Sequence, residues 1–385
     1  MAEDWRAGGF GLYIHWPFCA AKCPYCDFNS HVSRDIDQDR WRRAYLAEID
    51  RVGRLTAGRR LDTVFFGGGT PSLMEPDLVA AVLERVRGTW DTGNGLEVTL
   101  EANPTSVEAG RFRAYAEAGV NRLSMGVQAL NDEDLARLGR LHTAAEARAA
   151  FDTARSAFDR VSFDLIYARQ HQTLDAWRAE LSEALAMAVD HLSLYQLTLE
   201  PGTPFHDRAA RGTLAGLPDE PLGADMYDLT QELCAEAGLD AYEISNHARP
   251  GAESRHNLIY WRYGDYAGIG PGAHGRLSLG AGRLATDTEL APGKWLEAAE
   301  AGQGWRPADS LDPVDEAAEC LMMGLRLREG VSLSRLRALD PSALRDEAMA
   351  DLAELGLVER HGDRLRATDR GRLVLNGVIR QLLSD

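Results

Sequence analysis

Apolar and polar positions alternate with two different periods between residue 10 and about residue 199. Short runs of β-branched and other apolar residues are separated by longer stretches in which apolar residues recur with helical spacing. This alternation predicts parallel β-α-β units. Strands are expected at residues 11–15, 63–66, 96–100, 122–126, 161–167 and 191–199. Helices are expected at residues 39–52, 76–87, 107–118, 132–138, 144–157 and 174–189.

Six such repeats favour an α/β fold with a partial (β/α)6 barrel, similar to a TIM barrel, over an open nucleotide-binding sheet. The periodicity alone does not separate the two, but no Gly-x-Gly-x-x-Gly follows the first strand. In parallel barrels the carboxyl ends of the strands form the functional face. One shared cavity is therefore predicted from the polar residues at successive strands, which are the cysteine cluster, Gly67-Gly-Gly-Thr70, Glu101, Gln128 and Asp164.

The regular alternation of predicted strands and helices ends at about residue 200. A turn at residues 200–204, a helix at 221–237 and a strand at 241–245 are predicted, and the Gly- and Tyr-rich segment 256–274 is expected to lack regular structure. Residues 358–361 and 364–367 predict a hairpin between helices, as in a winged helix. We expect a barrel at residues 1–240, an extension packing on it at 241–310 and a small winged-helix-like domain at 311–385.

The net charge of the chain argues against two classes of binding partner. The net charge of −17 opposes nonspecific binding to nucleic acid or to an anionic membrane. No apolar run reaches the roughly 18 residues of a membrane span, and the first residues lack the pattern of a signal peptide. The sequence therefore predicts a cytoplasmic protein that has no transmembrane segment and does not bind nucleic acid. A peripheral contact with a membrane stays open.

Three of the five cysteines lie close together in Cys19-Ala-Ala-Lys-Cys23-Pro-Tyr-Cys26. In a reducing compartment such a cluster indicates metal ligands or reactive thiols. A zinc site would need a fourth ligand, which His15 or His31 could supply. A 4Fe-4S cluster on three thiolates would leave one iron open for a small ligand. Cys234 and Cys320 lie singly on apolar helical patterns and are expected to be buried.

The motif Tyr13-Ile-His-Trp-Pro-Phe-Cys19-x3-Cys23-x-Tyr25-Cys26 resembles the signature of the radical S-adenosylmethionine superfamily. Further motifs resemble the branch that contains oxygen-independent coproporphyrinogen III oxidases and heme chaperones of the HemW type. They are Gly67-Gly-Gly-Thr-Pro-Ser72, Leu100-Glu-Ala-Asn-Pro104, Ser124-Met-Gly-Val-Gln128, Phe163-Asp-Leu-Ile-Tyr167, Leu194-Tyr-Gln-Leu-Thr-Leu-Glu-Pro-Gly-Thr-Pro204, Tyr242-Glu-Ile-Ser-Asn246 and His256-Asn-Leu-Ile-Tyr-Trp261.

The resemblance implies a 4Fe-4S cluster on Cys19, Cys23 and Cys26. The open iron is chelated by S-adenosylmethionine, which an electron from a low-potential donor splits to a 5'-deoxyadenosyl radical. It also implies that Tyr13 lies beside the cofactor and that Tyr25 covers the cluster. The implied S-adenosylmethionine contacts are Gly68, Gly69, Thr70, Glu101, Gln128, Arg140 and Asp164. Residues 168–173 depart from the Gly- and Pro-containing turn that the family usually has there.

Within the branch, the oxidase motif carries a further thiol two positions after the last cluster ligand, where this chain has Phe28. Phenylalanine cannot donate a hydrogen atom, although it can pack against a planar macrocycle. The resemblance therefore favours a chaperone that binds heme and delivers it to acceptor hemoproteins. The alternatives are the oxidase and a protein that is stabilised by a structural zinc site and has no redox role. As imidazole is a common axial donor to heme iron, His256 is the first candidate ligand.

Overall fold

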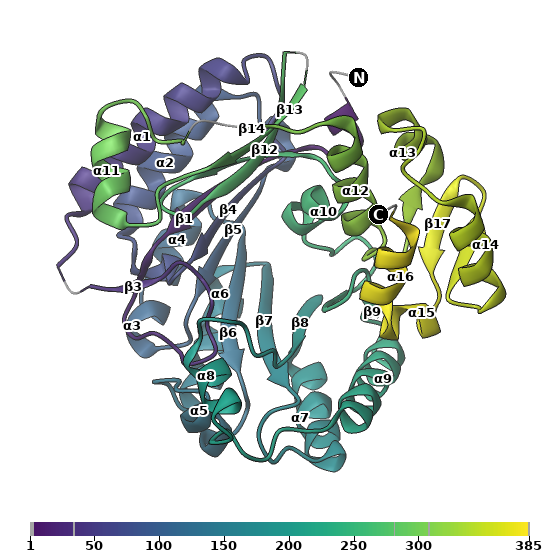
Figure 1. Ribbon diagram of the computed structural model, residues 1–385. Coiled ribbons are helices and arrows are strands. Elements are labelled where there is room, and N and C mark those ends of the chain that lie inside the picture. Colours follow the sequence, from purple (N-terminus) through teal and green to yellow (C-terminus); the bar gives the residue numbers. More distant parts are fainter. Residues whose placement is uncertain (1–3, 34, 281, 307–308, 384–385) are drawn as a thin grey trace.

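The computed structural model describes residues 4–33, 35–280, 282–306 and 309–383. Its centre is a curved sheet whose six parallel strands appear in sequence order, as predicted, and whose helices cover the outer face (Figure 1). The strands are β1 (Phe10–Trp16), β4 (Thr63–Gly68), β5 (Glu97–Ala102), β6 (Arg122–Gln128), β7 (Arg160–Tyr167) and β8 (His191–Gln196). The partial barrel predicted from the alternation is therefore confirmed.

The outer helices are amphipathic and pack their apolar sides on the strands. They are α1 (Gln38–Leu55), α2 (Pro76–Thr89), α3 (Ser106–Ala109), α4 (Phe112–Ala118), α5 (Asp132–Arg137), α6 (Ala144–Ala157) and α7 (Leu174–Met187). The single helix predicted at 107–118 is interrupted between α3 and α4. The strands are buried on both faces, so their sequences read as nearly continuous apolar runs.

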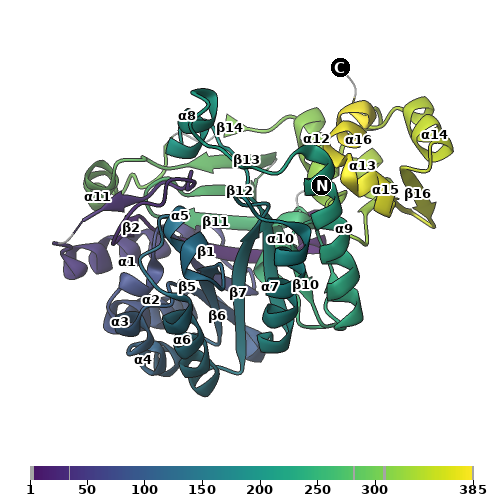
Figure 2. The ribbon, with the colours of Figure 1, turned by 90° about the horizontal axis from the view of Figure 1, so that it is seen from below.

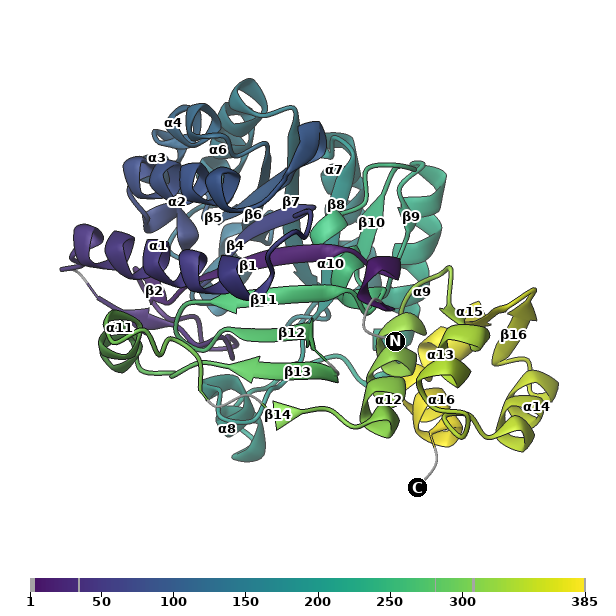
Figure 3. The same ribbon diagram turned by 90° about the horizontal axis from the view of Figure 1, so that it is seen from above.

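The segment after the barrel lengthens the sheet at both edges (Figure 3). At one edge, β11 pairs in parallel with β1, and three antiparallel strands follow it. At the other edge, β10 and β9 follow β8. The elements are α8 (Pro204–Ala210), α9 (Glu220–Glu236), β9 (Asp240–Ala241), β10 (Asn246–Ala248), α10 (Arg255–Trp261), β11 (Asp265–Ile269), β12 (His274–Leu279), β13 (Gly282–Asp287), α11 (Pro292–Glu300) and β14 (Asp309–Ser310).

Two sequence predictions fail in this extension. The segment 256–274 holds α10 and β11 rather than irregular backbone. Gly268 is needed within β11, since a Cβ there would lie 2.1 Å from the carbonyl oxygen of His274. The strand predicted at 241–245 is interrupted because the carboxylate of Glu243 accepts hydrogen bonds from the next two backbone N–H groups, at 2.6 and 3.1 Å. Those groups are then unavailable to a β-ladder.

The last part of the chain packs as a separate apolar cluster beside α9 and α10 (Figure 2). Its hairpin of β16 and β17 occupies the residues predicted for it. The elements are α12 (Pro313–Gly324), β15 (Val331–Ser332), α13 (Leu333–Leu339), α14 (Asp346–Glu354), β16 (Val358–His361), β17 (Arg364–Ala367), α15 (Asp369–Leu373) and α16 (Leu375–Leu382). No helix in the described ranges is long and apolar enough to cross a membrane.

Candidate functional site: a polar cavity under the cysteine loop

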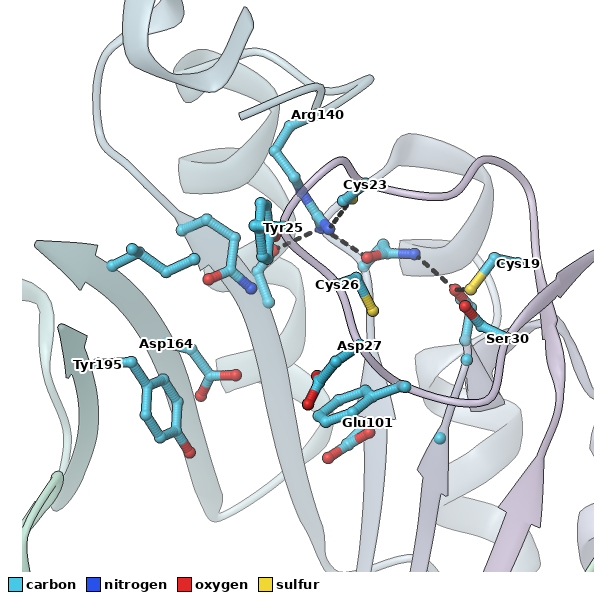
Figure 4. A pocket seen from close by; sticks show the side chains of 18 of the residues that line it. Cys19, Cys23, Tyr25, Cys26, Asp27, Ser30, Glu101, Arg140, Asp164 and Tyr195 are labelled. Atoms are coloured by element: carbon cyan, nitrogen blue, oxygen red, sulfur yellow. Dashed lines mark hydrogen bonds between the residues drawn. The ribbon is translucent and has the colours of Figure 1, made fainter. Parts of the chain in front are cut away.

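A cavity of about 580 Å³ lies at the carboxyl ends of the barrel strands, with the cysteine loop over it (Figure 4). We call it the polar cavity. Strands β4 to β8 each contribute at least one side chain or backbone group to its wall. The cavity brings together eleven of the thirteen residues singled out in the sequence: Cys19, Cys23, Tyr25, Cys26, Gly68, Gly69, Thr70, Glu101, Gln128, Arg140 and Asp164.

The cysteine loop is fixed at both ends. Strand β2 (Phe18–Cys19) enters it and β3 (His31–Val32) leaves it, and the two pair in parallel. In the middle, the carbonyl oxygen of Pro24 accepts a hydrogen bond from the backbone of Phe205 in α8, at 2.9 Å. The three cysteines of the loop are free and half-buried. Cys234 and Cys320 are buried in apolar clusters, as predicted.

A relay of hydrogen bonds connects two of the thiols across the cavity (Figure 4). Arg140 donates to Cys23 Sγ at 3.4 Å and to Asn103 Oδ1 at 2.6 Å. The amide of Asn103 donates to Thr70 Oγ1 at 3.1 Å, and Thr70 Oγ1 donates to Cys19 Sγ at 3.4 Å. Hydrogen bonds of this kind orient metal-binding thiolates and tune the potential of the metal centre.

The sequence reasoning missed Asn103, although a signal was present. It follows the end of β5 directly, just as Glu101 and Gln128 lie at or next to strand ends. It also stands in the Leu100-Glu-Ala-Asn-Pro104 motif, of which only Glu101 was selected. Ser124 and Ser193 were missed too; both hydrogen-bond the carboxylate of Asp164.

Two carboxyl groups on the floor of the cavity have raised pKa values. Burial, together with the charge of Asp164, raises the pKa of Glu101 to about 8. Burial also raises the pKa of Asp164 to about 6, against the opposing effect of its serine partners and of two arginines. A cation placed between these carboxyl groups would favour their charged forms. The floor therefore suits a ligand that carries an ammonium or sulfonium group.

The thiols and the glycine turn also fit the group that the motif implies. Burial raises the pKa of Cys19 and of Cys26, so loading with iron would release protons from thiols that are otherwise neutral. Gly68 has a φ of +112°. A Cβ at Gly69 would lie 2.6 Å from the carbonyl oxygen of Phe18, so this turn requires its glycines to pass beneath the loop.

Gln128 occupies an unusual backbone position at the edge of the cavity. Its φ is +73°, and the register between β6 and β7 shifts between Met125 and Gln128. A bulge at this point turns the strand end toward the cavity. The guanidinium of Arg140 donates to the carbonyl oxygen of Gly126 at 2.8 Å, next to the bulge. Such strained positions concentrate at functional sites.

Tyr13 and His256 lie outside the polar cavity. Tyr13 lines a neighbouring cavity and contacts His15 through its hydroxyl, at 3.0 Å from Nδ1. His256 is buried, with Nδ1 at 2.6 Å from Thr63 Oγ1 and Nε2 at 2.7 Å from Tyr260 Oη. Because both ring nitrogens are occupied, this geometry favours a structural role for His256 over ligation of heme iron.

The two histidines considered as fourth zinc ligands are engaged elsewhere. His15 Nε2 lies 2.9 Å from the carbonyl oxygen of Asn29, and His31 Nε2 lies 3.2 Å from Asn29 Oδ1. Among the described residues, no three His, Cys, Asp or Glu side chains converge as they would around a single ion. A 4Fe-4S cluster does not require its ligands to converge on one point, since each thiolate binds a different iron.

The loop that departs from the family pattern is held by buried charges. Ala168 and His171 have φ values of +57° and +61°, positions that glycine normally fills. Arg169 is buried and pairs with Asp134 at 2.8 Å and with Glu180 at 2.5 Å. These ion pairs stabilise the conformation of residues 168–172, although the positions with positive φ are not occupied by glycine.

Comparisons with known proteins place the chain in a family. Residues 13–183 match the radical SAM superfamily, and residues 311–374 match the HemN C-terminal domain. The chain belongs to the radical S-adenosylmethionine superfamily, and within it to the HemN-like branch. The family implies a 4Fe-4S cluster and S-adenosylmethionine as cofactors.

Particular relatives narrow the similarity further. The chain is 41% identical to radical S-adenosyl methionine domain-containing protein 1, mitochondrial, of Bos taurus, over 97% of this chain and 87% of the relative. It is 36% identical to the heme chaperone HemW of Haemophilus influenzae, over 97% of this chain and 98% of that one. The coproporphyrinogen III oxidase HemN of Escherichia coli shares the fold, with a TM-score of 0.80, 22% identity and coverage of 99% and 92%.

Proposed function

We propose that the protein is a heme chaperone, which binds heme together with a 4Fe-4S cluster and S-adenosylmethionine and delivers the heme to acceptor hemoproteins. The single observation that carries the proposal is Phe28. Its ring is 55% exposed and lines both the polar cavity and the neighbouring cavity that contains Tyr13. The oxidases of the family have a thiol at this position, and a phenyl ring cannot replace it in hydrogen transfer.

In this proposal the polar cavity holds the two family cofactors. Cys19, Cys23 and Cys26 hold the cluster, and the carboxylates of Glu101 and Asp164 face the cationic end of S-adenosylmethionine. Arg140 and the bulge at Gln128 complete the wall of the cavity. Together the cofactors supply one-electron chemistry when they are bound. The chain's own contribution is to orient them and to exclude water.

Relatives with the printed name HemW support the same function. They include the proteins of Haemophilus influenzae at 36% identity and Mycobacterium tuberculosis at 38% identity, each over 97% of this chain. The low-potential electron donor, the acceptor hemoproteins, the absence of nucleic-acid binding and any peripheral membrane contact stay predictions. The cytoplasmic location also stays a prediction, because relatives with mitochondrial names match as well.

The test uses the full chain after anaerobic reconstitution with iron and sulfide. One portion is titrated with heme, and another is incubated with S-adenosylmethionine, a reductant and coproporphyrinogen III. We expect heme uptake at one per chain and no decarboxylation. Formation of protoporphyrinogen would show the oxidase instead, and failure to bind heme would overturn the proposal.

Delivery is tested separately. The heme-loaded protein is mixed with the apo form of a b-type cytochrome, and transfer is followed by the shift of the Soret band. We expect transfer to be faster than from heme bound to serum albumin at equal concentration. Equal rates would show storage of heme without delivery.

A further inference from the structure

A second cavity, of about 410 Å³, adjoins the polar cavity. We call it the aromatic cavity. It is lined by residues of β1, β11 and β12 and of helices α10 and α12, whose arrangement can be followed in Figure 3. Phe28, Gly68 and Glu101 line both cavities, so the two share a wall.

Aromatic side chains dominate the lining of this cavity. Tyr13, Tyr260, Trp261 and Tyr266 face it, together with the half-exposed ring of Phe28. Tyr260 and Tyr266 pack edge to face, with ring centroids 4.5 Å apart. Cavities of this size lined by aromatic rings bind flat, largely apolar molecules.

One imidazole on the cavity wall is free to bind a metal. Two histidines line the cavity, His15 and His274. Both ring nitrogens of His15 are engaged, with the hydroxyl of Tyr13 and the carbonyl of Asn29. His274 stands at the start of β12 with an exposed side chain, and no residue of the described ranges hydrogen-bonds its ring.

A thioether and an unsatisfied donor complete the lining. Met323 reaches the cavity from α12, an element distant in sequence from the strand that carries His274. Histidine and methionine together form a common axial pair for heme iron. The indole nitrogen of Trp261 is buried and has no hydrogen-bond partner within the described part of the chain.

We propose that the aromatic cavity is the heme site of this protein, with His274 as a ligand of its iron and Met323 as a second possible donor. This inference rests on the proposed chaperone function and specifies where its cargo binds. The rings of Phe28, Tyr260, Trp261 and Tyr266 contact the macrocycle. Helix α12 belongs to the segment that matches the HemN C-terminal domain, so that domain closes the site.

The location has a consequence for function. Phe28 and Glu101 separate the proposed heme site from the polar cavity by a single layer of side chains. Heme would therefore lie next to the cluster and S-adenosylmethionine without displacing either.

The experiment titrates the cluster-loaded full chain with heme and records visible and electron paramagnetic resonance spectra. For His274→Ala we expect heme affinity to fall by at least about 10-fold, since loss of even an outer partner of a metal ligand can cost this much. The matched control is His361→Ala, which removes an exposed imidazole in the hairpin. The control should bind heme as the unaltered chain does. Unchanged affinity and spectra for His274→Ala would overturn the inference.

Two further variants separate loss of a ligand from loss of folding. His274→Gly should regain heme binding when imidazole is added, because free imidazole can occupy the space of the side chain. Met323→Leu preserves most of the apolar volume, and its heme spectrum should lose the features of thioether ligation. Absence of rescue in a variant that still assembles its cluster would count against His274 as ligand.

The outcomes distinguish this inference from the function on which it rests. If the unaltered chain takes up no heme, the chaperone function fails. If the unaltered chain binds heme and both His274 variants bind it equally well, the function stands and the heme site lies elsewhere. His256→Ala, measured alongside, would then show whether the buried histidine acts as ligand after rearrangement.

Discussion

The polar and aromatic cavities adjoin at Phe28, Gly68 and Glu101 but differ in chemistry. The polar cavity collects thiols, carboxylates and a guanidinium, and hydrogen bonds fix the guanidinium relative to two of the thiols. The aromatic cavity presents ring faces, a free imidazole and a thioether. The first suits a charged cofactor with a fixed orientation, and the second suits a flat molecule that must also leave.

This difference follows from the position of β11. In the barrel proper, the strand ends carry polar residues toward one centre. The addition of β11 beside β1 places a further strand end, followed by the turn to His274, on the far side of Phe28. Under the two proposals, one face of the sheet would hold both ligands. Three of the predictions below measure the ligands of both cavities, and the Glu101 prediction measures the stability of the fold.

The largest effect is expected from the cysteine loop. Replacement of Cys19, Cys23 and Cys26 by alanine should abolish cluster assembly and leave heme uptake unchanged. Iron and sulfide analysis after reconstitution measures the first, and heme titration measures the second. The control variant carries alanine at the buried Cys234 and Cys320, and it should assemble a full cluster. Retention of the cluster in the triple variant would refute the assignment of the ligands.

Arg140→Lys should weaken binding of S-adenosylmethionine to the cluster-loaded protein by about 10- to 100-fold, since a charge-assisted hydrogen bond contributes about 1.5–3 kcal/mol. Lysine retains the charge but cannot replace the planar donor fork that contacts Cys23 and Asn103. Isothermal titration calorimetry measures the affinity. Arg137→Lys, on the outer helix α5, is the control and should bind normally. A parallel loss of heme affinity would contradict the separation of the two cavities.

The raised pKa of Glu101 predicts a pH-dependent stability of the cofactor-free protein. The folded protein holds a proton on this carboxyl up to about pH 8, whereas the unfolded chain releases it near pH 4.5. The free energy of unfolding should therefore decrease as pH rises between these values. Because the side chain is only half-buried and water screens it, we expect a loss of about 1–2 kcal/mol.

Denaturant unfolding at a series of pH values measures this effect. Glu101→Gln should remove most of the decrease, since glutamine does not titrate. Glu133→Gln on the exposed side of α5 should leave the pH profile as it is. An unchanged profile for Glu101→Gln would show that this carboxyl is ionised in the folded protein.

The smallest effect is expected at the shared wall. Phe28→Ala removes one ring from the aromatic cavity, and heme affinity should fall by about 3- to 10-fold, because an aromatic contact is worth about 0.5–1.5 kcal/mol. Cluster content should not change, since Phe28 is not a ligand. Val32→Ala, an exposed apolar residue just beyond the cysteine loop, is the control. Equal heme affinity for Phe28→Ala and the control would remove Phe28 from the heme site.

The barrel and the polar cavity could be predicted because their signals are local. Each parallel strand is a short apolar run, so a polar residue at its end, such as Glu101 or Gln128, or within it, such as Asp164, stands out by position alone. Strand β11 could not be predicted in this way. Its glycines predict an interruption of regular secondary structure, although Gly268 is required within the strand because the backbone of His274 approaches it closely.

The histidines show a second limit of the sequence. His256 stands in a distinctive motif, but its motif partner Tyr260 and the distant Thr63 occupy both of its nitrogens. His274 stands in a stretch without obvious chemistry, yet it lines the aromatic cavity, and the other histidine there, His15, has both ring nitrogens engaged. Whether a ring nitrogen of His256 or His274 is free to bind iron depends on residues far away in the sequence. The spacing of motifs alone therefore could not show which of the two histidines is the better candidate ligand.

The most direct test of two separate cavities is a titration of one sample with both ligands. The cluster-loaded chain is first saturated with radiolabelled S-adenosylmethionine and then titrated with heme, while the retained label is counted after rapid desalting. The account predicts that one heme binds per chain and that the label is retained. Release of one S-adenosylmethionine for each heme bound would show that a single cavity serves both ligands and would contradict it.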